Sequence, residues 1–243
     1  MPTLVLVRHG RTSANAAGVL AGRAAGVRLD AVGCGQAQRL GNRLTALPLA
    51  RVVSSPLERT LQTARAIVQN RTDGIEVRRD HGLIECGYGS WTGRPIKELA
   101  KERLWKTVQA HPSAVTFPDG EAMADMQRRA VAAVRRHDGE VADENGDDAV
   151  WVAVSHGDVI KSVLADALGL HLDQFQRIGV DPASVSVLRY TAQRPFVLHV
   201  NDHGNDLSAL RPPARAKRRR RRGSSDSDAV IGGGAGSSVG PPA

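Results

Sequence analysis

The 243-residue sequence predicts an α/β fold with a mostly parallel central sheet. Short apolar runs of strand length alternate along the chain with longer segments whose apolar residues recur at helical spacing. This alternation is typical of folds in which crossover helices cover the faces of a parallel sheet. Apolar residues make up 41% of the chain and aromatic residues only 3%, so the sequence predicts a sizeable core built mainly from Ala, Val, Leu and Ile.

The first half of the chain is expected to hold three strands and two helices. TLVLV at 3–7 and ARVVSS at 50–55 are short strand candidates, and IEVRRD at 75–80 alternates like a half-buried strand. Helices are expected at 33–46 and 57–69, because apolar residues recur there every three or four positions. The first two strands are therefore each followed by a helix.

The second half is expected to continue this alternation. Its apolar runs predict strands, and its periodic segments predict helices. The predicted strands are 149–155, 184–190 and 195–201, and the predicted helices are 96–111, 121–142 and 157–169. Residues 81–95 are rich in glycine and are expected to form an irregular loop.

Residues 1–210 are predicted to form one domain and residues 211–243 a disordered tail. The tail has too few apolar side chains to offset the entropy cost of ordering it. It carries eight basic and two acidic residues, so most of the net charge of +8 belongs to the tail and the domain is nearly neutral.

Six consecutive cations, Lys217–Arg222, give the tail a second interpretation. Such a run can bind nucleic acid or an anionic membrane weakly through its charge. No aromatic residues lie among the cations to stack on bases, so sequence-specific recognition is not expected. A solvated tail that aids solubility is the simpler alternative.

The sequence favours a cytoplasmic location. Its two cysteines, Cys34 and Cys86, give neither a disulfide framework nor metal-ligand spacing. The first apolar run is four residues long before Arg8 interrupts it, which is too short for a signal peptide. No run approaches the length of a membrane span.

Charged residues follow two of the predicted buried strands. Arg8, His9 and Gly10 end the first strand, and His156 and Gly157 follow the strand at 149–155. Ligands in open α/β sheets bind beyond the carboxyl ends of the strands. If these two strands are neighbours, His9 and His156 face the same crevice.

Two further charged residues lie at comparable positions. Arg59 falls in the first turn of the helix 57–69, where a cation opposes the helix dipole unless an anionic ligand is bound. Glu85 lies in the Gly-rich loop, and Glu121 and Asp158 are alternative acidic groups. The pattern therefore indicates an anion site at one edge of the sheet.

Five motifs in this order resemble the histidine phosphatase superfamily of phosphoglycerate-mutase-like proteins. They are LVRHGRTSAN, SSPLERTLQTA, LIECGYGSWTG, FPDGE and AVSHGDVI, within residues 3–160. RHG alone is a weak signal, whereas five motifs in order are specific. The likeness extends to an actinobacterial subgroup of probable phosphomutases and phosphatases. It implies a three-layer αβα sandwich, phosphoglycerate-mutase-like, around a mostly parallel sheet.

The resemblance also implies roles for the site residues. His9 would be the nucleophile that forms a phosphohistidine, with a backbone carbonyl of the RHG turn fixing its tautomer. Arg8, Arg59 and His156 would surround the phosphoryl oxygens. Glu85 would protonate the leaving group. No metal or cofactor is expected, because Arg and His⁺ supply the positive charge.

The substrate is expected to be a small phosphorylated metabolite. The predicted substrate contacts are Arg8, Gly10, Thr12, Asn15, Gly22, Arg59, His156 and Gly157. Arg11 stands where many relatives have an acidic residue, and Ala21 or Gly22 stands where several have Gln or Thr. The organic part of the substrate therefore cannot be carried over from those relatives.

The expected activity is metal-independent hydrolysis of a phosphomonoester through phospho-His9. A phosphoglycerate-type phosphomutase is the first alternative, disfavoured because the chain reads RHGRT and shows no long insertion to close the site. A non-catalytic binding module with a basic tail is the second alternative. Relatives are often dimers, so a homodimer is compatible with the resemblance.

Overall fold

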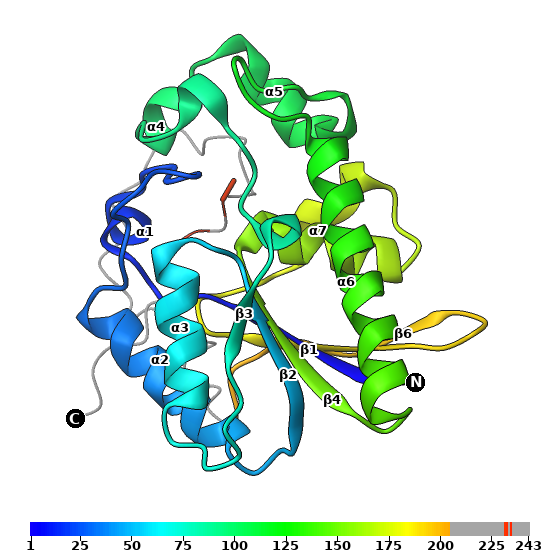
Figure 1. Ribbon diagram of the computed structural model, residues 1–243. Helices are drawn as coiled ribbons and strands as arrows, with labels where there is room; N and C mark the ends of the chain where they lie inside the picture. Colours follow the sequence, from blue (N-terminus) through cyan, green and yellow to red (C-terminus); the bar gives the residue numbers. More distant parts are fainter. Residues whose placement is uncertain (205–230, 233, 235–243) are drawn as a thin grey trace, which may run out of the picture.

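The strands of the computed structural model, which describes residues 1–204, 231, 232 and 234, form one sheet in the order β3-β2-β4-β1-β5-β6 (Figure 1). The strands are β1 (Thr3–Arg8), β2 (Leu49–Ser54), β3 (Val77–Arg79), β4 (Val150–Ser155), β5 (Val185–Tyr190) and β6 (Pro195–Asp202). β1, β2, β3 and β4 are mutually parallel, whereas β5 runs antiparallel to β1, and β6 antiparallel to β5. The mostly parallel sheet is confirmed.

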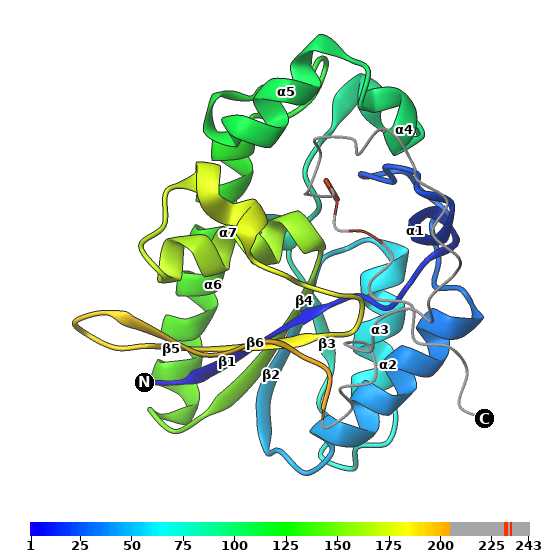
Figure 2. The same ribbon diagram turned by 180° about the vertical axis from the view of Figure 1, so that it is seen from behind.

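Two helical layers cover the two faces of this sheet. The longer helices are α2 (Ala31–Leu44), α3 (Glu58–Val68), α5 (Arg103–Ala110), α6 (Met123–Asn145) and α7 (Gly157–Ala167), and the short ones are α1 (Ser13–Ala17) and α4 (Ile96–Leu99). α2 and α3 lie on one side of the sheet, and α6 and α7 lie on the other (Figures 1 and 2). The predicted three-layer αβα sandwich is confirmed.

The alternation of side chains along β1 explains the two layers. Successive residues of a strand point to opposite faces of the sheet. Leu4 and Leu6 belong to the apolar cluster that includes α6 and α7, whereas Val5 and Val7 belong to the cluster that includes α2 and α3. A strand buried on both faces requires a continuous apolar run such as the one at 4–7.

The predicted helix 96–111 is two helices, which corrects that prediction. α4 ends at Leu99, and Glu102 has extended backbone angles before α5 begins. Leu99 and Trp105 are both buried. Six positions along an unbroken helix lie about 120° apart around its axis, and the break frees the two side chains from that fixed angle. The break lets both enter the core.

α1 follows the RHG turn and was not predicted. Thr12 caps its N-terminus in a capping box with Asn15, and Gly18 ends it with a left-handed backbone (φ +65°). Five residues are too few to show helical periodicity, so the caps are its main signal.

Three residues near the C-terminus are described, and they pack against the domain. They are Ile231, Gly232 and Gly234, and Ile231 is only 1% exposed. The other residues after 204, including the basic run at 217–222, lie outside the described residues, so the predicted disorder of 211–243 stays a prediction there. In the described part of the chain, no helix is both long and apolar enough to cross a membrane.

Candidate active site

The carboxyl ends of β1, β2 and β4 meet at one edge of the sheet. β4 lies between β1 and β2, and Arg8 at the end of β1 pairs with Ser155 at the end of β4. His9 and His156 follow these two residues directly, and their ring centroids are 5.2 Å apart. The two histidines expected to share a crevice are therefore neighbours.

His9 is held as a neutral imidazole. Its Nδ1 lies 2.7 Å from the carbonyl oxygen of Gly10, and Arg59 Nε lies 3.3 Å from its Nε2. Burial, and then the positive charges of Arg59 and Arg8, hold the pKa of His9 well below its ordinary value. Nδ1 therefore donates its proton to Gly10, and the unprotonated Nε2, which accepts the Arg59 Nε–H here, carries the electron pair for attack.

Close packing of two glycines fixes the turn that carries His9. A Cβ on Gly10 would lie 2.5 Å from the Gly33 carbonyl oxygen, and a Cβ on Gly33 would lie 1.9 Å from the Arg11 carbonyl oxygen. The first turn of α2 therefore packs directly on the backbone that follows β1. Glycine at both positions is required by this close approach.

Arg59 reaches from the first turn of α3 to the centre of the site. It is 2% exposed, and its Nη2 donates to the Gly22 carbonyl oxygen over 2.7 Å. Its buried Nη1 has no hydrogen-bond partner among the described residues. An unsatisfied buried donor costs about 1–3 kcal/mol, which an anionic oxygen would offset. Arg59 thus has the geometry of an anion ligand.

Glu85 supplies a carboxyl group that titrates near neutrality. It is 3% exposed, and the Cys86 N–H donates to its Oε1 over 2.9 Å. Burial, and then the negative charge of Asp158, raise the pKa of Glu85 to about 7. Its Oε2 lies 4.0 Å from His156 Nδ1. Glu85 is therefore able both to donate and to accept a proton near neutral pH.

The two alternative acidic groups are held in other roles. Glu121 accepts from Arg129 Nε over 2.6 Å and from Arg23 over 2.8 Å, and its pKa is lowered by Arg129 in spite of burial. Asp158 accepts a 2.7 Å bond from the Tyr88 hydroxyl. The geometry therefore favours Glu85 as the proton donor.

Arg8 and His156 lie beside the cavity. Arg8 Nη1 donates to the Val180 carbonyl oxygen and Nη2 to that of Gly234, both over 2.8 Å. His156 Nε2 lies 2.7 Å from the Ser55 hydroxyl. Neither side chain is among the described residues that line the cavity, so the direct phosphate contacts implied for them are not seen at its surface.

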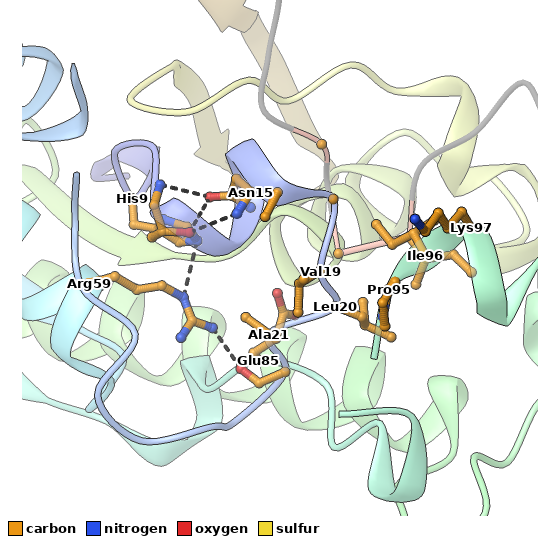
Figure 3. A pocket seen from close by; sticks show the side chains of 17 residues that line it. His9, Asn15, Val19, Leu20, Ala21, Arg59, Glu85, Pro95, Ile96 and Lys97 are labelled. Atoms are coloured by element: carbon orange, nitrogen blue, oxygen red, sulfur yellow. Dashed lines mark hydrogen bonds between the residues drawn. The ribbon is translucent and has the colours of Figure 1, made fainter. Parts of the chain in front are cut away.

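The cavity itself has a volume of about 410 Å³ and two chemically different ends. His9, Asn15, Arg59 and Glu85 form the polar end, and Val19, Leu20, Pro95 and Ile96 the apolar end (Figure 3). Lys97 also lines the cavity, beside Ile96. The polar end fits a phosphoryl group, and the apolar end fits the organic part of its ester.

Half of the predicted substrate contacts line the cavity. Thr12, Asn15, Gly22 and Arg59 line it, whereas Arg8, Gly10, His156 and Gly157 are not among the described residues that do. Thr12 Oγ1 donates to Asn15 Oδ1 over 2.8 Å, so the neutral donor of this pair is the Asn15 amide. Sequence reasoning missed the apolar end, since no chemical signal marks those residues.

The fold and the site together define an enzyme class whose chemistry is phosphoryl transfer. Comparison with known proteins makes the assignment definite. The family model of the histidine phosphatase superfamily (branch 1) matches residues 4–203, and the chain belongs to this superfamily. The superfamily predicted from the five motifs is therefore confirmed.

Two curated relatives and one solved structure show the range of similar proteins. "Phosphoserine phosphatase 1" of Hydrogenobacter thermophilus is 30% identical over 206 residues, which are 83% of this chain and 92% of the relative. "Probable phosphoglycerate mutase GpmB" of Yersinia enterocolitica is 31% identical over 192 residues, 78% of this chain and 86% of the relative. YhfR of Bacillus stearothermophilus superposes with a TM-score of 0.74 at 28% identity, covering 84% of this chain and 99% of YhfR. The chain is an enzyme of the phosphatase or mutase type.

Proposed function

We propose that the chain is a metal-independent phosphomonoester hydrolase that acts through phospho-His9. One observation carries this proposal: the buried, neutral His9 and the carboxyl of Glu85, titrating near 7, line the same cavity. A nucleophile needs a free electron pair and a general acid needs a proton at the same pH. These two groups meet both needs near neutral pH.

In the first step, His9 Nε2 attacks the phosphorus atom and the bond to the ester oxygen breaks. Glu85 gives its proton to that oxygen, so that an alcohol leaves. Arg59 Nη1 donates to a non-bridging phosphoryl oxygen and stabilises the charge of the transition state. The nearby charge of Arg8 acts in the same direction.

In the second step, the Glu85 carboxylate takes a proton from a water molecule whose oxygen attacks the phosphohistidine. The N–P bond breaks, inorganic phosphate leaves and Glu85 is protonated again. His9 Nε2 recovers its electron pair, while Nδ1 stays hydrogen-bonded to the Gly10 carbonyl oxygen. All groups return to their starting protonation states.

A phosphomutase is the second candidate, because a relative named as a phosphoglycerate mutase is 31% identical to the chain. A mutase returns the phosphoryl group from the histidine to its intermediate and must keep water away meanwhile. The RHGRT sequence and the short helix α4, whose Ile96 and Lys97 line the cavity, favour the hydrolase.

Phosphate release from a panel of phosphomonoesters in EDTA tests the proposal, with His9→Ala as the control. We expect release from wild type and none from His9→Ala. Isomerisation of 3-phosphoglycerate without net release would make the enzyme a mutase. Neither activity in a folded protein would favour the binding module with its basic tail.

Several finer predictions accompany this proposal. The substrate is a small phosphorylated metabolite, as phosphoserine is for the Hydrogenobacter relative named phosphoserine phosphatase 1. Membership of the actinobacterial subgroup, a cytoplasmic location, a homodimer and weak anion contacts through Lys217–Arg222 stay predictions.

A further inference from the structure

A short segment near the C-terminus returns to the cavity from a distant part of the sequence. Ile231, Gly232 and Gly234 all line the cavity, and we call them the C-terminal wall. In Figures 1 and 2 this stretch, drawn in red, lies beside α1 and below α4. The superfamily match ends at residue 203, so the wall lies outside the part of the chain that the family describes.

Two hydrogen bonds to charged side chains hold the wall in place. The Gly232 N–H donates to Asp158 Oδ2 over 2.9 Å, and the Gly234 carbonyl oxygen accepts from Arg8 Nη2 over 2.8 Å. Bonds with one charged partner are about twice as strong as neutral ones. Asp158 is fully buried and Arg8 is 1% exposed, so neither bond is a loose surface contact.

Apolar packing also holds the C-terminal wall against the domain. Ile231 belongs to the same buried cluster as Leu20 and Tyr88. Gly232 has a left-handed backbone (φ +72°), and a Cβ there would lie 2.9 Å from Leu20 Cδ1. Both the backbone angle and the close approach favour glycine at this position. The C-terminal wall therefore packs against residues from separate parts of the domain.

The wall bounds the cavity without filling it. About 410 Å³ remains with the wall in place, and His9, Arg59 and Glu85 still line that space. Val19, Leu20 and Ile96 of the apolar end also line it. A plug would have removed the space beside His9, whereas a wall limits what can enter.

We propose that the C-terminal wall is a specificity-determining part of the substrate site, with Ile231 limiting the size of the ester's organic part. The proposal rests on the proposed function, which places the phosphoryl group at His9. The favoured substrates are phosphomonoesters with a compact organic part that has an apolar face. Their apolar face packs on Ile231, and bulkier esters are excluded by it.

Full-length Ile231→Ala and Gly232→Ala test the proposal with phenyl phosphate and 4-biphenylyl phosphate, two esters with similar leaving groups and different sizes. We expect kcat/KM for the small ester to fall in both variants and the ratio of the bulky-ester to the small-ester kcat/KM to rise at least about tenfold, since one methylene in an apolar pocket changes specificity by about this factor or more. Leu198→Ala, an exposed position on β6, is the matched control and should leave the ratio unchanged.

Binding of two phosphonates, benzylphosphonate and 4-biphenylylmethylphosphonate, gives the same comparison without hydrolysis. We expect Ile231→Ala to shift their relative affinities, measured by calorimetry, in the direction of the bulky compound. If the relative affinities shift in this way but the protein hydrolyses neither ester, the proposed function is rejected and the role of the C-terminal wall in limiting ligand size is retained. An equal gain in kcat/KM for both esters would mean that the C-terminal wall is an inhibitory plug. Unchanged ratios of kcat/KM and of phosphonate affinity would mean that the C-terminal wall is not part of the substrate site. Either result overturns the proposal.

Discussion

Replacing Glu85 by Gln removes the proposed proton donor with little change of shape. Gln cannot protonate a leaving alkoxide, so we expect kcat for an alkyl phosphate to fall about 10²–10⁴-fold, the usual contribution of general acid catalysis. 4-Nitrophenyl phosphate should lose less than about tenfold, because 4-nitrophenolate is a stable anion that leaves without a proton. The difference between the two substrates is the specific signature of a lost acid.

The raised pKa of Glu85 sets the pH at which this role is active. A pKa of about 7 leaves roughly nine-tenths of Glu85 protonated one unit below that value and one-tenth one unit above it. For the alkyl phosphate, kcat of the wild type should therefore decline about tenfold per pH unit above about pH 7. His9, whose pKa is held well below its ordinary value, stays neutral across this range.

Steady-state kinetics of wild type and Glu85→Gln with both substrates, from about pH 5 to pH 9, measure these effects. Glu121→Gln is a control, because Glu121 is held by Arg23 and Arg129 away from the proposed chemistry. Equal losses on both substrates in Glu85→Gln would refute the assignment, and so would an alkaline decline that persists unchanged in that variant.

Three further outcomes follow from the geometry. Arg59→Lys keeps a charge but lacks the planar fork that reaches both His9 and Gly22, and kcat/KM should fall about 10²–10³-fold in phosphate-release assays; a loss below about threefold would contradict this role. Gly33→Ala places a methyl group 1.9 Å from the Arg11 carbonyl oxygen, and urea unfolding should show a loss of about 1–3 kcal/mol. The pKa of Glu85 is about 7 in the folded state and 4.5 in the unfolded state. The contribution of Glu85 to the free energy of unfolding is therefore most favourable below about pH 4.5, where the carboxyl is neutral in both states, and this contribution is lost as the pH rises through about 7. Glu85→Gln should therefore be more stable than wild type by about 3 kcal/mol at about pH 8, with no such gain at about pH 4, in urea unfolding.

The parallel sheet could be predicted because burial on both faces leaves a direct trace in the sequence. Continuous runs of apolar residues occur at 4–7 and 149–154, and the strands β1 and β4 occupy almost the same ranges. Because His9 and His156 come just after these two runs, the sequence also predicts that both lie at the edge of the sheet where the strands have their carboxyl ends. Strand order was needed as well, and only the structure shows that β4 separates β1 from β2.

The apolar half of the cavity could not be predicted in this way. Val19, Leu20 and Ile96 look like any other core residues in the sequence, and they meet only because the chain before α4 pairs back on the loop after α1. The role of Ile231 was even harder to predict from the sequence, because Ile231 stands in a segment whose composition indicates disorder. A single buried side chain and two glycines are too weak a signal against that background.

One physical cause produces both of the protonation states that the proposed reaction needs. Burial disfavours the charged form of any group, which lowers the pKa of His9 and raises that of Glu85. Arg59 and Arg8 also act against a charged His9, and Asp158 acts against a charged Glu85, whereas Arg59 and Arg8 offset part of the rise in the pKa of Glu85. Arg8 and Asp158 are also the two residues that hold the C-terminal wall. The groups that set the chemistry of the site therefore also place the segment that we propose limits its substrates.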